Sequence, residues 1–448
     1  MLLGVLVACA RAPAPSAATA AVPSPDPVPW RYEVALRGPD LQIEARFAPG
    51  VTGAPHVDDD AAPFVRDLTT TTEAGWRVVR YRFALHEAAM KRMDPDTAIA
   101  SGDVVVAPPS TWLLHPDVAT PGTFRFHVVT APPARFVAGT HPSPDGAPDT
   151  YEAPTETLDA SSFAVFGGFH AATIESGASR VLVSAAPRDL PLTDADVTAW
   201  VKAAVDGIAS YLGRSFPAPR TLVVVQRGTP GNPTRGVTLG DGGPAVLVRA
   251  GDGVTAGTTR DDWVMTHELL HVVMPSLTRD HVWLSEGIPS YVEPIVRVRA
   301  GTLAPEKLWR DLVEGLPQGL PEAGDGGLEK THTWGRTYWG GSLYCLMADV
   351  RIREETRNAR SLDDVLRAVV ASGGGVEAHW DVQRMFDVGD AATGTHVLHE
   401  VYRELGLAPG TVDLPALWRR LGVKVEADRV MFDDTAPLAG VRRGIAGR

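Results

Sequence analysis

Residues 261–293 have the sequence DDWVMTHELLHVVMPSLTRDHVWLSEGIPSYVE, and this stretch decides how the rest of the chain is interpreted. It places His267, Glu268 and His271 in the pattern H-E-x-x-H. Residues four apart on an α-helix lie on one face with Cβ atoms about 6 Å apart, so both imidazoles can reach one metal ion. The spacing therefore predicts a metal-binding helix.

This helix is expected to be buried. Asp261 or Asp262 can cap its start, and it must end before Pro275. Polar side chains in so apolar a helix need partners, because unpaired polar groups are costly away from water, and a metal ion supplies one. The apolar residues that surround the two histidines are Val264, Met265, Leu269, Leu270, Val272 and Val273.

The expected metal is Zn²⁺. A catalytic zinc takes three protein ligands and keeps one position open, so His267 and His271 need a third partner. Glu286, separated from His271 by fourteen residues, is the expected third ligand. Glu268 lies beside the metal, where it can act as general base on a water whose pKa zinc lowers to about 7. Glu293, two turns after Glu286, is expected to accept a hydrogen bond from a ligating imidazole.

Two segments resemble the glycyl aminopeptidase-like gluzincins, zinc metallopeptidases related to aminopeptidase N and leukotriene hydrolase. The first is W-L-S-E-G at 283–287, where the family has the glutamate that is its third zinc ligand. The second is the stretch 337–369, which begins T-Y-W-G-G, continues as an apolar helix and then reaches S-L-D-D-V at 361–365. The resemblance implies that Glu286 binds zinc and that the phenol of Tyr338 hydrogen-bonds the developing oxyanion.

The chain departs from this family at two places. Family aminopeptidases have a Gly-Gly-x-Glu type segment whose acid holds the amino terminus of the substrate, and the corresponding residues 240–243 contain Asp241 but no glutamate. Gly340 stands where the family has a lysine. Glycines in a strand let another backbone approach closely, so Gly242 and Gly243 are expected on a cleft-edge strand that binds substrate. A surface hairpin loop is the alternative.

The expected fold is α+β and multidomain. Short alternating runs from Trp30 to about Ser184 predict an antiparallel β-sandwich-like domain, to which we assign residues 30–186. The resemblance implies that residues 187–425 form a thermolysin-like zinc peptidase domain with a mainly helical C-terminal part. Residues 426–448 remain as a C-terminal tail.

The first residues point to export. Residues 1–9, MLLGVLVAC, are apolar up to Cys9, and their last four resemble the lipobox of bacterial lipoproteins, in which the cysteine carries the lipid. Residues 10–29 are rich in Ala, Pro and Ser and are expected to form a flexible linker. The expected location is the periplasm or cell envelope. A cleaved or vestigial apolar tail is the alternative, because no positive charge precedes the apolar run.

Composition excludes some classes of partner. The 448 residues carry a net charge of −12 with no cluster of Lys and Arg, which argues against nucleic acid and against an anionic membrane surface. Membrane contact is expected only through the lipid anchor. The expected activity is zinc-dependent hydrolysis of a peptide or protein, with exopeptidase, endopeptidase and oligomeric state left open. A catalytically silent lipoprotein that binds a peptide or protein on the same scaffold is the alternative, and hydrolysis of a non-peptide bond is a third.

Overall fold

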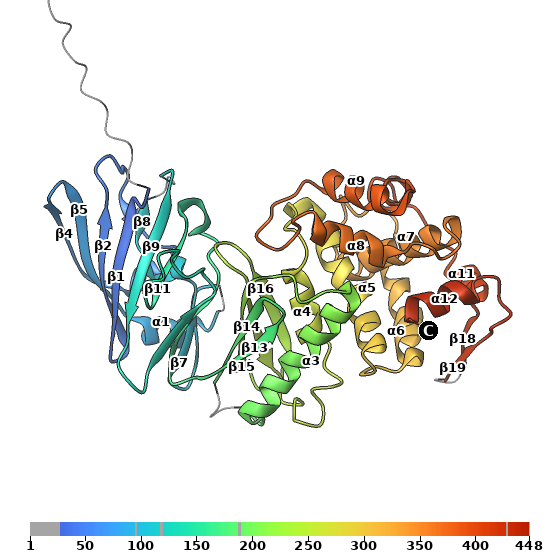
Figure 1. Ribbon diagram of the computed structural model, residues 1–448, viewed down its shortest axis with the longest axis horizontal. Helices are drawn as coiled ribbons and strands as arrows, with labels where there is room; N and C mark the ends of the chain where they lie inside the picture. Colours follow the sequence, from blue (N-terminus) through green and yellow to red (C-terminus); the bar gives the residue numbers. More distant parts are fainter. Residues whose placement is uncertain (1–26, 95, 117–119, 187–189, 427–428, 448) are drawn as a thin grey trace, which may run out of the picture.

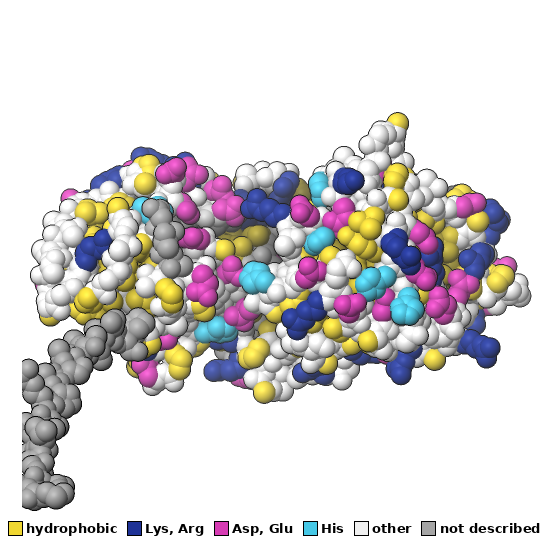
Figure 2. Space-filling model, turned by 90° about the horizontal axis from the view of Figure 1, so that it is seen from above, with side chains coloured by type: hydrophobic (Ala, Val, Ile, Leu, Met, Phe, Trp, Pro, Cys, Tyr) yellow, Lys and Arg dark blue, Asp and Glu magenta, His cyan; other side chains and the backbone are white. Residues whose placement is uncertain are grey.

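A computed structural model describes residues 27–94, 96–116, 120–186, 190–426 and 429–447, and Cys9 lies outside them. The described chain is elongated, with strands gathered in its first part and helices in its second (Figure 1). A search of these residues for a helix able to span a bilayer finds none. Acidic and basic side chains are interspersed over the face that Figure 2 shows.

Two sheets form the first part. The strands of the larger one are β1 (Trp30–Arg37), β2 (Asp40–Phe47), β4 (Val65–Glu73), β5 (Trp76–Phe83), β9 (Thr123–Val129) and β11 (Thr150–Pro154). The smaller one contains β6 (Ile99–Ser101), β7 (Val104–Ala107), β10 (Arg135–Ala138) and β12 (Ala164–Gly167). Their orders are β11-β9-β1-β2-β5-β4 and β10-β12-β7-β6. The short elements around them are β3 (Pro55–His56), β8 (His115–Pro116), α1 (Leu85–Arg92) and α2 (Pro109–Trp112).

Aromatic side chains fill the space between these sheets. Trp112 meets Phe126 and Phe166 edge-on, with ring centroids 5.6 and 5.5 Å apart. The alternation of β1 and β2, which buries every second residue over much of each strand, supplies one wall of this core. The expected sandwich-like domain is therefore confirmed. It is antiparallel except where β1 and β9 pair in parallel.

A third sheet begins the second part. It contains β13 (His170–Ser176), β14 (Ser179–Ala185), β15 (Arg220–Arg227), β16 (Arg235–Leu239) and β17 (Ala245–Ala250), in the order β13-β14-β15-β17-β16. Strand β14 pairs in parallel with β15, which places residues 170–185 in this sheet. The predicted boundary after residue 186 is therefore wrong, and the change of sheet falls between β12 and β13. The alternation of residues 170–185 predicted half-buried strands, but it did not indicate which sheet these strands join.

Helices cover one face of the third sheet and form most of the rest of the chain (Figure 1). Their bounds are α3 (Asp194–Leu212), α4 (Val264–Val272), α5 (Val282–Arg299), α6 (Pro305–Gly315), α7 (Gly341–Glu355), α8 (Leu362–Ala371), α9 (Val382–Thr393), α10 (Val397–Val401), α11 (Leu414–Leu421) and α12 (Ala439–Ala446). The short strands β18 (Val423–Glu426) and β19 (Arg429–Phe432) lie between the last two. The mainly helical C-terminal part is thus confirmed. Val441 and Ile445, in the predicted tail, pack into the same hydrophobic core as the other helices.

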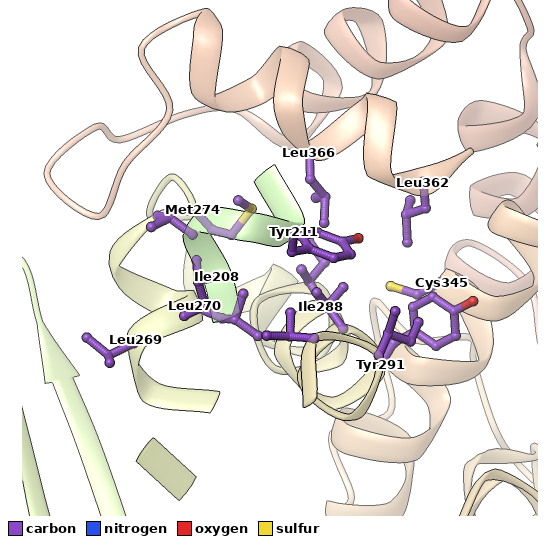
Figure 3. Packing of buried hydrophobic residues seen from close by; sticks show 14 of the residues in the cluster. Ile208, Tyr211, Leu269, Leu270, Met274, Ile288, Tyr291, Cys345, Leu362 and Leu366 are labelled. Carbon is purple, nitrogen blue, oxygen red and sulfur yellow. The ribbon is translucent and has the colours of Figure 1, made fainter. Parts of the chain in front are cut away.

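One apolar core unites these helices. Figure 3 shows side chains of α3, α4, α5, α7 and α8 meeting in it: Ile208, Tyr211, Leu269, Leu270, Ile288, Tyr291, Cys345, Leu362 and Leu366. A separate cluster joins the opposite face of the third sheet, through Leu222, Val224 and Leu247, to strands β7 and β12. The third sheet is therefore covered on both faces, which holds the edge strand β16 in a defined position beside α4.

Helices α5 and α7 approach each other through glycine. A methyl group added at Gly287 would overlap the backbone of Gly341, and one at Gly341 would overlap the carbonyl of Trp283. The close approach places Glu286, on α5, near the π-helical turn Arg336–Gly340 that leads into α7. The two glycines therefore set the spacing of the elements that carry Glu286 and Tyr338.

Gly341→Ala should lower the free energy of unfolding by about 1–3 kcal/mol, because the overlap outweighs the roughly 1 kcal/mol that alanine gains over glycine in a helix. Gly440→Ala in α12 is the matched control, since its added methyl meets an atom of Asn358 at an ordinary 3.6 Å. Denaturant unfolding of both variants measures the difference. Equal stability of the two would contradict the close packing of α5 on α7.

Candidate metal centre

The helix α4 presents the H-E-x-x-H residues from a buried position. The Asp262 carboxylate accepts hydrogen bonds from the backbone N–H groups of Val264 at 3.0 Å and Met265 at 3.3 Å, which confirms one of the two predicted caps. His267 and Glu268 are only 4% and 7% exposed. The local sequence thus starts the helix one turn before the polar residues and buries them.

Glu286 meets the two histidines from the neighbouring helix. Its Oε2 lies 3.2 Å from Nε2 of His267 and 3.6 Å from Nε2 of His271. The two imidazole rings are 5.0 Å apart between centroids. One ligand atom from each of the three residues lies within 4.8 Å of the others. Helix α5 begins at Val282 and continues through Pro289 and Pro294.

Electrostatics favours the charged form of this cluster. Burial raises the pKa of Glu286, but its hydrogen bonds to His267 and His271 lower it more, so the pKa lies well below its usual range. Burial lowers the pKa of His271, while the hydrogen bond to Glu286 raises it, and the net shift is upward. Two imidazole nitrogens and an ionised carboxylate oxygen converge here, and this donor set fits a divalent metal ion.

A cavity of about 650 Å³ opens on the cluster. Its wall includes Glu268 and the run Pro233–Thr238, most of which belongs to the edge strand β16. The Thr238 hydroxyl donates to Oε2 of Glu268 at 2.7 Å. Because β16 is an edge strand, it can present backbone donors and acceptors to an extended chain in this cavity.

Tyr338 lies in the wall of the same cavity. Its ring centroid is 6.5 Å from that of His267. Burial, helped by the negative charges of Glu286 and Glu268, raises the pKa of Tyr338 to about 12. The phenol is therefore protonated at neutral pH and can donate a hydrogen bond. The structure thus brings together all five residues expected at the metal and the reacting bond.

Trp263, Trp334 and Thr238 are residues of the cavity wall that the sequence did not predict. Trp263 and Trp334 line the cavity, yet they are 49% and 63% exposed. Each stands four residues before a site residue, His267 or Tyr338, and this helical spacing was the signal that could have found them. Thr238 had no such signal, because its contact with Glu268 joins a strand to a helix.

The expectation for Gly242 and Gly243 is wrong. Both lie in the turn between β16 and β17, where the carbonyl of Gly242 accepts a hydrogen bond from the backbone N–H of His141. Neither lines the cavity. The alternative of a surface hairpin loop is right about the hairpin but not about the surface, because both glycines are buried, and the cleft-edge strand is the preceding β16. Asp241 also points elsewhere, with Oδ1 3.0 Å from Nε2 of His379.

The expectation for Glu293 is also wrong. Its carboxylate accepts a hydrogen bond from Nη1 of Arg297 at 2.9 Å, and Nδ1 of the buried His267 has no hydrogen-bond partner in the part of the chain that the structure describes. Burial, partly offset by Arg297, raises the pKa of Glu293 to about 7. Seven residues along a helix keep the same face but advance about 10 Å, which carries Glu293 past the imidazoles. It pairs with Arg297 instead.

Comparison with known proteins identifies the fold. No family model matches the chain, and no curated protein matches it. The crystal structure of an aminopeptidase N family protein from Idiomarina loihiensis is similar, with a TM-score of 0.66 and 13% sequence identity over 89% of this chain and 79% of that one. The chain has an aminopeptidase N-type fold. The resemblance drawn from residues 283–287 and 337–369 is thereby confirmed for the fold. Within it, the His-His-Glu cluster lies on α4 and α5.

Glu293→Ala should destabilise the protein without removing metal. Among the described residues, its partner Arg297, whose side chain is 8% exposed, would keep one acceptor, the carbonyl of Arg260, so the loss is about 3–5 kcal/mol. Asp206→Ala, which breaks an exposed ion pair with Lys202 on α3, is the control and should cost less than about 1 kcal/mol. Thermal unfolding and metal analysis measure both effects. Loss of metal from a folded Glu293→Ala variant would instead support the predicted hydrogen bond between Glu293 and a ligating imidazole.

Proposed function

We propose that this protein is a zinc metallopeptidase. The proposal rests on one observation. His267, His271 and Glu286 converge in the wall of one cavity, together with the carboxylate of Glu268, which is not part of the His-His-Glu cluster. The aminopeptidase N-type fold supports it, because peptides are the substrates that such a fold implies. Two histidines and one glutamate are a ligand set that catalytic zinc takes in hydrolases.

The residues of the cavity have separate tasks in this proposal. His267, His271 and Glu286 would hold the zinc ion, which supplies a Lewis acid beside the scissile carbonyl. Glu268 takes a proton from the attacking water and passes it to the leaving amine. The Tyr338 phenol donates a hydrogen bond to the oxygen on which negative charge develops, a contact typically worth about 3 kcal/mol in the transition state. The edge of β16 aligns the substrate backbone.

The charges in the cavity bear on whether the enzyme cleaves internal peptide bonds or removes N-terminal residues. Among the described residues that line it, the carboxylates are those of Glu268 and Glu286. Both are committed, one to the proton and one to the metal. A free amino terminus would therefore lack the third carboxylate that holds it in family aminopeptidases. This favours cleavage of internal peptide bonds over the removal of single N-terminal residues.

Glu268→Gln should keep zinc bound and lower peptide cleavage at least about 100-fold, because the amide cannot accept the proton. The assay incubates the full chain with a diverse peptide mixture, with and without a zinc chelator, and maps the cut positions by mass spectrometry. Glu404→Gln, which alters an acid paired with Arg351 away from the cavity, is the control and should be fully active.

Chelator-insensitive cleavage, or near-normal activity of Glu268→Gln, would refute the mechanism. Peptide binding without any cleavage would establish the alternative, a silent peptide- or protein-binding lipoprotein. Cuts confined to the first residue of each peptide would overturn the preference for internal bonds.

We also propose that the protein is exported and lipid-anchored through Cys9. The support is the sequence of residues 6–9 and the Ala- and Pro-rich segment after them. A bacterial host grown with a labelled fatty acid should label the wild-type chain, and Cys9→Ala should remove the label because the thiol that carries the lipid is gone. A wild-type chain that stays unlabelled would refute the anchor.

A further inference from the structure

The Glu268 carboxylate has one protein hydrogen-bond donor among the described residues. The Thr238 hydroxyl lies 2.7 Å from Oε2 of Glu268 and 3.0 Å from the backbone carbonyl oxygen of the same residue. Glu268 is 7% exposed, so water reaches its side chain only from the cavity. The conformation of the base therefore depends on a residue of a different element, the edge strand β16.

A second residue of β16 is shaped to the same side chain. A methyl group added at Gly236 would overlap Cγ and the carboxyl group of Glu268. Positions 236 and 238 lie on one face of the strand, because side chains alternate along it. Gly236 leaves room for the Glu268 side chain, and Thr238 donates a hydrogen bond to its carboxylate. The strand and the base are thus packed as a unit.

Such contact matters for a general base. A glutamate side chain has three rotatable bonds, and a base must stay within about 2.6–3.2 Å of the proton that it takes. An exposed carboxylate would sample many rotamers, whereas a hydrogen bond to a rigid strand selects one. Hydrogen bonds to charged groups are also among the stronger ones in proteins. The geometry is therefore that of a base held in place before substrate arrives.

We propose that Thr238 is a positioning residue, which holds the Glu268 carboxylate toward the metal cluster and couples it to the strand along which substrate lies. This inference rests on the proposed peptidase function. It adds a requirement that neither the metal ligands nor the base impose: the residue at 238 must carry a hydroxyl. Because β16 also binds the substrate, binding and alignment of the base occur on one strand.

The test is a double-mutant cycle on the full chain, with a fluorogenic peptide chosen from the sequences that the wild type cleaves. Thr238→Val should lower kcat about 10- to 100-fold, the range expected for a hydrogen bond to a charged group, with KM changed less than about threefold. Thr238→Ser, which restores the hydroxyl, should recover most of the activity. In the Glu268→Gln background, Thr238→Val should cause no further loss.

Controls separate positioning from general damage. Thr111→Val removes a buried hydroxyl that donates to the carbonyl of Thr97 at 2.7 Å in the first part of the chain, and it should leave kcat unchanged. Bound zinc should be the same in wild type and Thr238→Val. If the valine variant does not fold, Thr238→Ala removes the same hydroxyl with a smaller side chain. Either variant, once folded, tests the role of the hydroxyl.

Two outcomes would overturn the inference. One is a Thr238→Val variant with wild-type kcat, and the other is an equal loss from Thr238→Val with and without Glu268. Both differ from failure of the proposed function, in which Glu268→Gln would itself remain active.

Discussion

The carboxylate of Glu286 between the imidazoles of His267 and His271 is the contact on which the rest of this structure depends. It joins α4 and α5, two buried helices that are separate in the sequence. It also places charged groups where apolar side chains surround them. Burying a carboxylate is costly unless it is paired, so these helices can pack only in an arrangement that brings Glu286 to the histidines or to a metal that they share.

Several features of the fold maintain that arrangement. The glycines at 287 and 341 let α5 and α7 approach closely, and the π-helical turn before α7 then brings the ring of Tyr338 to 6.5 Å from that of His267. The apolar cluster between the third sheet and strands β7 and β12 holds β16 against α4. No described residue of the first part of the chain thus lines the cavity, but that part supports the strand that does.

Sequence reasoning succeeded where local spacing carries the information. The aspartate cap and the following proline predicted α4 close to its observed bounds, because capping and helix-breaking act within a few residues. It failed for residues 170–185, which alternate like the preceding strands but pair with β15. It failed for Gly242, Gly243 and Glu293, because the direction in which a turn or a helix face points depends on the packing of distant elements.

What the sequence determined by itself was the set of chemical groups: H-E-x-x-H on one helix, a later glutamate, a tyrosine and no glutamate in the glycine segment. Helical periodicity is enough to place two histidines on one face, so the metal hypothesis needed no tertiary information. Only the tertiary structure decided that β16 forms the cleft edge, that Thr238 contacts the base and that Glu293 pairs with Arg297. These contacts join a strand to a helix, or depend on how far a side chain reaches into a packed core, and no local pattern of residues encodes them.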